Sequence, residues 1–428
     1  MERPANNTRL LASIRAGLLV LVAVMPFHAF LSVWGGHLFG HQGIIQAWKD
    51  ILALALVAST GWYVVRNRYA AAALRQPVAY LILAFAVVAG LVTVFTWPGL
   101  SAVAYGVKTD IEFLALFMVA YVVGSTALTA RLVRVIVMTG IVVAVIAALL
   151  SFALPPDFLA RFGYGPDTIL PFRLIGPAAY GIRTPATLGG PNQLGAYLII
   201  PFCLGVAVIT MRRWLAPIIA ILTLGIYVSF SRSAWIGAAI GAWIAALAAL
   251  SRRVALGITA LSVLVAFMAT LALFNWSGSQ ARYYLFHARP GAAVSDDSTA
   301  QHLAAVQDAG VRLAAHPFGM GLGSAGPASF QTTRPVISED YYLQIALETG
   351  VLGLVLFAGI IGAVGWKLYQ ARTHSVARGL LGALIGLSVA NLFLHVWADS
   401  TTALVFWIAA GTFLGSVRIP LKERRHAA

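Results

Sequence analysis

Runs of about 20 consecutive apolar residues recur along the whole chain, and an α-helix needs this length to cross the hydrocarbon core of a bilayer. Of the 428 residues, 60% are hydrophobic and only 10% are charged, which is not the composition of a soluble globular domain. The single cysteine, Cys203, lies inside an apolar run, so the chain can form no internal disulfide. The sequence therefore predicts an all-α polytopic membrane protein whose stability comes from helix packing in lipid.

About twelve such runs can be placed, and they predict one integral membrane domain over residues 1–428. The first run follows three arginines and has no small-residue cleavage site after it, so it is interpreted as a retained helix rather than a signal peptide. The runs lie at about residues 13–34, 44–65, 77–97, 109–128, 133–154, 191–211, 214–230, 233–250, 254–275, 341–364, 378–397 and 401–417.

The net charge of +15 could suggest a nucleic-acid partner, but the distribution of the charge argues against one. If the N-terminus is cytoplasmic and the helices alternate, most of the basic residues fall in short cytoplasmic segments, as the positive-inside rule requires. The charges are then an orientation signal, and both termini are predicted to be cytoplasmic. These basic residues are Arg3, Arg9, Arg15, Arg66, Arg68, Arg75, Arg131, Arg134, Arg212, Arg213, Arg252, Arg253, Lys367, Arg372, Arg378, Arg418, Lys422, Arg424 and Arg425.

Two segments on the opposite side of the membrane are long. Residues 155–190 form the first loop, and residues 276–340 form a larger loop between the predicted helices nine and ten. The larger loop contains a predicted short helix, in which Asp308 and Arg312 form an i,i+4 ion pair and which Pro317 ends. With the topology above, both loops are predicted to be periplasmic, and they are insertions between helices rather than separate domains.

The stretch "YVSFSRSAWIG" places Arg232 between two apolar runs, in a very short turn on this outer side. An arginine at bilayer depth costs several kcal/mol, about 3 on insertion scales, and a tight turn leaves this one little room to extend to water. A guanidinium recognises phosphate in a planar, bidentate way. A transporter would instead place ionisable groups near the midplane of two related halves. Arg232 is therefore predicted to bind a phosphate or diphosphate presented from the bilayer.

Four motifs in order give the chain a family resemblance. It resembles the superfamily of O-antigen ligases, O-antigen polymerases and pilin-type oligosaccharyltransferases, and among these the ligases. The resemblance implies a GT-C-like helical fold in a bacterial inner membrane, with one large periplasmic loop and a periplasmic active site. The motifs are "RTPATLGGPNQLGAYL" (183–198), "SFSRSAWIG" (229–237), "HPFGMGLGS" (316–324) and "EDYYLQIALETGVLG" (339–353).

The resemblance also implies an activity and its partners. Members transfer O-antigen polysaccharide from undecaprenyl diphosphate to a sugar hydroxyl of lipid A–core, without a metal, a cofactor or a nucleotide sugar. Arg232 and Arg183 would stabilise the diphosphate leaving group, and Lys108 and Arg312 are further candidates for diphosphate binding. Asp296–Asp297 could suggest a metal site, but two carboxylates beside a helix start are more simply explained by the helix dipole.

The chain departs from the family pattern at the expected base. The family usually has a histidine immediately before the residues that match "DYYL", and this chain has Glu339 there. A carboxylate can activate a hydroxyl at a sugar carbon, but an acid at this position could also serve only the helix dipole. His302 and His316 are the substitutes if Glu339 does not act as the base. His28 and His395 are expected within helices, as packing residues.

Three other functions remain open from the sequence. O-antigen polymerase and protein O-oligosaccharyltransferase use the same chemistry with a different acceptor, and a flippase or exporter would bind the same lipid-linked glycan without cleaving it. A candidate base in the outer loop and arginines gathered on one side argue against the exporter. The sequence does not separate ligase from polymerase, and it gives neither the sugar nor the linkage.

Overall fold

The computed structural model describes residues 5–174, 182–209, 215–251, 253–255, 257–259 and 297–418. Within these ranges the protein is helical except for turns, loops and one antiparallel pair of short strands, β1 (Arg173–Leu174) and β2 (Ile182–Arg183). The α-helices are α1 (Ala5–Val24), α2 (His28–Phe39), α3 (Gln42–Gln46), α4 (Trp48–Arg66), α5 (Arg68–Ala71), α6 (Pro77–Thr96), α7 (Leu100–Gly106), α8 (Glu112–Val123), α9 (Thr126–Phe152), α10 (Pro191–Ile209), α11 (Ala216–Val228), α12 (Arg232–Leu247), α15 (Asp297–Ala315), α16 (Tyr341–Gln370), α17 (Ser375–Ala390) and α18 (Ser400–Arg418).

Shorter helical turns join these elements. The π-helical turn η3 (Val107–Ile111) connects α7 to α8. The 3-10 turns are η1 (Met25–Phe27), η2 (Ala72–Arg75), η4 (Phe158–Phe162) and η6 (Gly326–Gln331).

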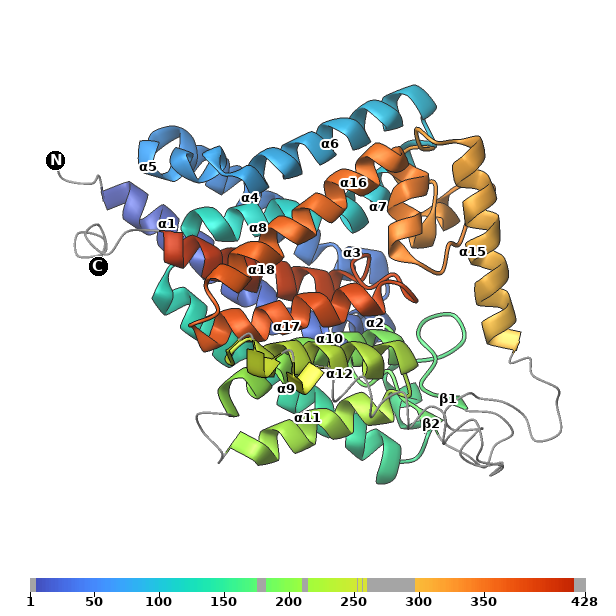
Figure 1. Ribbon diagram of the computed structural model, residues 1–428. Helices are drawn as coiled ribbons and strands as arrows, with labels where there is room; N and C mark the ends of the chain where they lie inside the picture. Colours follow the sequence, from blue (N-terminus) through green and yellow to red (C-terminus); the bar gives the residue numbers. More distant parts are fainter. Residues whose placement is uncertain are drawn as a thin grey trace.

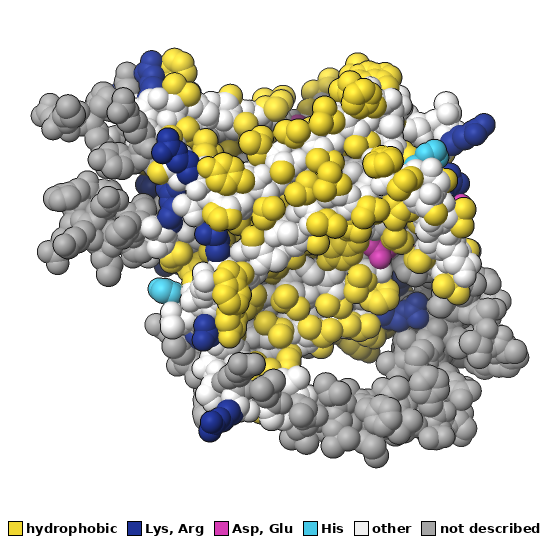
Figure 2. Space-filling model, turned by 45° about the horizontal axis from the view of Figure 1, so that its top comes forward, with side chains coloured by type: hydrophobic (Ala, Val, Ile, Leu, Met, Phe, Trp, Pro, Cys, Tyr) yellow, Lys and Arg dark blue, Asp and Glu magenta, His cyan; other side chains and the backbone are white. Residues whose placement is uncertain are grey.

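The long helices form a bundle with two distinct ends (Figure 1). α1 begins and α18 ends at one end, whereas α15 and the β1–β2 pair lie at the other. In the described residues, seven helices are long and apolar enough to cross a membrane. Hydrophobic side chains cover much of the surface between the two ends, and many Lys and Arg side chains lie toward the end where α1 begins (Figure 2). These features are those of a polytopic membrane protein.

The centre of the bundle is α18, whose side chains are buried along almost its whole length against α8, α9 and α17. α17 in turn packs along α12 and α10, and α6 covers α16 on the other flank. The α12–α17 contact needs small residues, because a Cβ added to Gly237 would lie 2.5 Å from the Gly386 carbonyl oxygen. Such close backbone approach is the usual way in which helices associate in lipid.

Most of the predicted apolar runs lie in helices where the structure describes them, as for 77–97, which is α6, although the run at 109–128 is divided between α8 and α9. Most of the run at 254–275 and the loop from there to residue 296 lie outside the described residues, so the count of about twelve spans stays a prediction. Within the outer loop, the predicted helix is confirmed as α15, and Arg312 Nε donates to Asp308 Oδ2 across 2.6 Å.

One run is shorter as a helix than the sequence predicts. The run at 378–397 was expected to be helical throughout, but α17 ends at Ala390. The side chain of the buried Asn391 accepts bonds from the backbone N–H groups of Val396 and Trp397, at 3.0 and 3.1 Å. These bonds take the place of helical hydrogen bonds, so the chain continues as a loop in which Val396 and Trp397 are buried and Leu392 and Phe393 are exposed. The expectation that His395 lies in a helix is therefore wrong.

The motif "HPFGMGLGS" forms a loop that docks into a break in α16. Gly350 has φ 73° and interrupts the helix, a backbone conformation that favours glycine. The carbonyls of Leu347 and Glu348 accept instead from the N–H groups of Met320 and Gly321, at 2.7 and 2.9 Å. The outer loop is thus hydrogen-bonded directly to the backbone of a membrane helix.

Candidate active site

A cavity of about 630 Å³ opens at the end of the bundle that carries α15 and the β1–β2 pair. The first residues of α2, α10 and α18 contribute to its wall, as do the loops before α16 and α18. Helix N-termini carry partial positive charge, which favours anions. The polar and charged residues of its wall are His28, Ser32, Gln42, Gln46, Lys49, Tyr105, Lys108, Asp167, Thr168, Asn192, Gln193, Glu339, His395, Asp399, Ser400 and Thr401.

Glu339 lies on the cavity wall immediately before α16. Asp340, not Glu339, caps this helix, because its carboxylate accepts from the N–H groups of Tyr342 and Leu343 at 2.7 and 3.1 Å. The backbone of Glu339 has φ 58°, a left-handed conformation that costs a non-glycine residue about 1–3 kcal/mol. Asp340 thus has the role at the helix N-terminus that the sequence left open for Glu339. The left-handed turn places Glu339 on the cavity wall instead.

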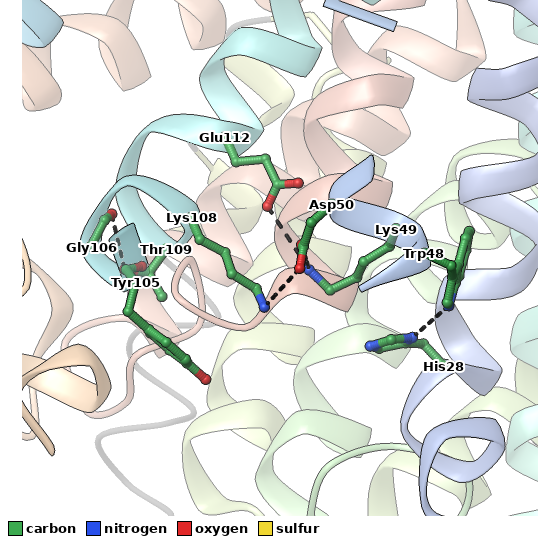
Figure 3. A network of polar contacts seen from close by, with 9 residues as sticks. All are labelled: His28, Trp48, Lys49, Asp50, Tyr105, Gly106, Lys108, Thr109 and Glu112. Atoms are coloured by element: carbon green, nitrogen blue, oxygen red, sulfur yellow. Dashed lines mark hydrogen bonds and ion pairs between the residues drawn. The ribbon is translucent and has the colours of Figure 1, made fainter. Parts of the chain in front are cut away.

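Lys108 reaches the cavity from η3 as part of a network of charges (Figure 3). Its ammonium lies 3.1 Å from Asp50 Oδ2. The buried Lys49 pairs with the other oxygen of Asp50 and lies 4.0 Å from Glu112 Oε2. Two cations and two carboxylates therefore balance one another at this wall. The network fixes η3 against α4 and leaves little net charge there.

His28 and Trp48 fix a second side of the same wall. The indole N–H of Trp48 donates to His28 Nδ1 at 3.1 Å. Because an indole nitrogen only donates, His28 Nδ1 must carry no proton. The ring of His28 therefore presents its other nitrogen, Nε2, as the protonated one when the imidazole is neutral.

Three arginines gather beside the cavity. Arg173 and Arg183 face each other as partners in the β1–β2 pair, and Arg232 is the first residue of α12. Burial, followed by the charges of Arg173 and Arg232, lowers the pKa of the half-buried Arg183 to about 10. The guanidinium group of Arg183 is thus repelled by those of Arg173 and Arg232, and Arg183 remains charged at neutral pH. An anion at this cluster would relieve the repulsion.

Asn192 connects this arginine cluster (Arg173, Arg183 and Arg232) to the cavity. Arg183 Nη2 donates to Asn192 Oδ1 at 2.7 Å, and Arg183 Nε donates to the Ser229 carbonyl oxygen at 3.2 Å. Asn192 itself lines the cavity, while Ser229 lies in the turn that leads to Arg232. The motifs around residues 183–198 and 229–237 thus meet at one place, next to the wall that holds Glu339.

The other predicted site residues lie elsewhere. Arg312 and His316 are exposed on and just after α15, and neither lines the cavity. Arg312 forms its ion pair with Asp308 instead. His302 belongs to α15, but its side chain lies outside the described part of the chain. Among the candidates from the sequence, the structure therefore brings together Glu339, Lys108 and, through Asn192, the arginine cluster.

Sequence reasoning missed several residues of the cavity wall. Asn192 was noted only within a motif, and Lys49 lies inside an apolar run. His395 was expected to pack within a helix, yet it lines the cavity. Asp399 accepts from the N–H and hydroxyl of Thr402, and burial raises the pKa of its carboxyl group. The loop that ends α17 early brings His395 to the wall, and the hydropathy pattern does not reveal that loop, whereas Asp399 already falls between two predicted runs.

A comparison with known families identifies part of the chain. Residues 217–358 match the family model described as O-antigen ligase. These residues form a domain of the O-antigen ligase superfamily. The matched residues run from α11 through Arg232, α15 and Glu339 into α16. Arg183, Lys108 and His395 lie outside the match. None of the curated proteins compared with the chain matches it.

Proposed function

We propose that this protein is an O-antigen ligase. It transfers the O-antigen glycan from undecaprenyl diphosphate to a sugar hydroxyl of lipid A–core, at the periplasmic face of the bacterial inner membrane. The supporting observation is the junction at Asn192: the cavity wall that holds Glu339 adjoins a cluster of three arginines, two in the β1–β2 pair and one at the start of α12.

In the proposed reaction, Glu339 accepts the proton of the acceptor hydroxyl. The hydroxyl oxygen then forms its bond to the anomeric carbon of the donor glycan, and the bond from that carbon to the diphosphate oxygen breaks. The leaving diphosphate carries away the electron pair, and Arg183 and Arg232 stabilise the added negative charge. Guanidinium groups thus take the role that a divalent metal has in other diphosphate chemistry.

Deletion of the gene tests the reaction class. We expect the lipopolysaccharide of the deletion strain to run on a gel as core without a ladder, while long lipid-linked O-antigen accumulates. This result follows because a ligase acts after the polymer is complete. Core that carries a single repeat unit would instead assign the protein as a polymerase, and an unchanged ladder would contradict both.

Cysteine labelling tests the proposed orientation. Cys203 is fully buried, so in a Cys203→Ser protein the only cysteine that can be labelled is the one introduced by substitution. His316→Cys, at the exposed end of α15, should react with a membrane-impermeant maleimide in cells whose outer membrane is permeabilised. His374→Cys, exposed between α16 and α17, is the matched control and should react only after the inner membrane is opened. The reverse pattern would invert the topology.

A further inference from the structure

Two uncharged groups hold the guanidinium of Arg183. Its Nη2 donates to Asn192 Oδ1 at 2.7 Å, and its Nε donates to the Ser229 carbonyl oxygen at 3.2 Å. In the part of the chain that the structure describes, no carboxylate forms an ion pair with Arg183. The hydrogen bonds of Arg183 therefore orient its guanidinium and leave the positive charge uncompensated.

These two bonds also leave the donors that a phosphate needs. A guanidinium carries five N–H groups in one plane. Nε and one hydrogen of Nη2 are used, so both hydrogens of Nη1 and the second hydrogen of Nη2 have no acceptor among the described residues. The two η nitrogens of an arginine can donate together to two oxygens of one phosphate. The protein thus holds Arg183 in place while its η nitrogens stay available for such a contact.

The amide of Asn192 can face Arg183 in only one way. Because a guanidinium only donates hydrogen bonds, the amide atom beside it must be the oxygen, and the amide NH2 group points away from Arg183. Asn192 is the second residue of α10 (Pro191–Ile209) and lines the cavity. The start of α10 therefore places an uncharged hydrogen-bond acceptor between Arg183 and the cavity.

Stability alone would favour aspartate at position 192. Aspartate has nearly the size of asparagine, and its carboxylate would form a charge-assisted hydrogen bond with Arg183. The first turn of a helix also favours negative side chains. The same carboxylate, however, would cancel the positive charge that an incoming diphosphate needs. Asparagine keeps the hydrogen bond to Arg183 and leaves that charge for the ligand.

We propose that Asn192 is a positioning residue that holds Arg183 for the donor diphosphate and that it must be uncharged to do so. Its amide oxygen fixes the guanidinium, and the η nitrogens of Arg183 donate to the diphosphate as the bond to the anomeric carbon breaks. Asn192 acts through Arg183 and does not touch the reacting atoms. This inference rests on the proposed function, and it adds that the residue at position 192 must accept a hydrogen bond without carrying charge.

Replacing Asn192 with aspartate and with alanine separates this role from a structural one. Asn192→Asp keeps the acceptor and adds a charge, whereas Asn192→Ala removes the acceptor and adds none. For protein in lipid nanodiscs, we expect the Kd for undecaprenyl diphosphate to rise by about 100-fold in Asn192→Asp and by about tenfold in Asn192→Ala. Without ligand, Asn192→Asp should melt no lower than the wild type, because its carboxylate pairs with Arg183 and lies at a helix N-terminus. If Asn192 only tied the loop to α10, Asn192→Ala would be the more damaging change.

Three controls accompany these variants. Gln307→Glu makes the same change from amide to carboxylate at an exposed position of α15 and should bind undecaprenyl diphosphate as the wild type does. Undecaprenol has the same tail without the charge, and its binding should not differ between the variants. In an Arg183→Ala protein, Asn192→Ala should cause no further loss of affinity, because residues that act through one contact are not additive.

Each outcome decides between the two proposals. Wild-type affinity in Asn192→Asp, or weaker binding by Asn192→Ala than by Asn192→Asp, would overturn the positioning role and leave the proposed function in place. Independent losses in the double variant would do the same, and this comparison decides the question if Asn192→Asp does not fold. Wild-type protein that does not bind undecaprenyl diphosphate would remove the proposed function and the positioning role together.

Discussion

Replacing Glu339 with glutamine is expected to lower the rate of glycan transfer by about 100-fold or more. Glutamine keeps the size of the side chain and its hydrogen-bonding reach, but it cannot accept the proton of the acceptor hydroxyl. The turn around residue 339 should keep its shape, because Asp340 caps α16 independently. The measurement is transfer by purified protein from lipid-linked donor to lipid A–core at saturating acceptor.

Two companion variants make this result specific. Asp157→Asn removes an exposed carboxylate from another outer loop and should leave transfer unchanged. Glu339→His supplies a different base, so measurable activity should return and should fall as the pH is lowered and the imidazole is protonated. Equal rates for the wild type and Glu339→Gln would end the assignment of this base and move the search to other proton acceptors of the cavity wall, His395 and Asp399.

Removing either arginine of the cluster should have an effect of similar size. Arg183→Ala and Arg232→Ala are each expected to lower the rate of transfer by about 100-fold or more, since each leaves diphosphate charge unbalanced in a poorly hydrated place. Arg232→Lys should also be strongly impaired if the contact is bidentate. The exposed Arg334 lies in the same outer loop as Glu339, and Arg334→Ala is the control that should remain active.

A binding measurement separates this role from a structural one. Burial and then the like charges of Arg173 and Arg232 lower the pKa of Arg183, so an anion bound there should stabilise the folded protein. We expect undecaprenyl diphosphate to raise the melting temperature of the wild type and of Arg334→Ala, but much less that of Arg183→Ala. Full activity in well-folded Arg232→Ala and Arg183→Ala proteins would remove the diphosphate assignment.

Hydropathy predicts the helices of this fold well because the bilayer forces apolar residues into continuous runs. The run at 341–364 is found within α16, and the short turn that carries Arg232 lies between α11 and α12 as expected. What the pattern could not show is where an apolar stretch stops being helical. Asn391 ends α17 through its own side chain, and Gly350 breaks α16 where another loop supplies the hydrogen bonds.

The candidate site was predictable only in part, for a related reason. Arg232 stands out in the sequence because a charge near lipid is costly, and Arg183 and Glu339 stand out because they lie in motifs of the family that the chain resembles. Other residues of the cavity wall do not stand out in the sequence, because their role depends on contacts between distant parts of the chain. Asn192 matters through its bond to Arg183, and His395 through its contact with Ser338, 57 residues away in the chain. No spacing rule reveals such pairs.

The glycine-rich loop docks at Gly350, and this contact limits which segments of the protein can be exchanged with those of a related protein. A natural or engineered hybrid that exchanged only residues 276–340 would leave the carbonyls of Leu347 and Glu348 facing a foreign loop. A Cβ at Gly319 would lie 2.6 Å from the Gly350 nitrogen, so even a single unmatched side chain would disturb both partners. The smallest exchangeable unit therefore includes the outer loop together with the first half of α16, and acceptor preference should be inherited with that unit as a whole.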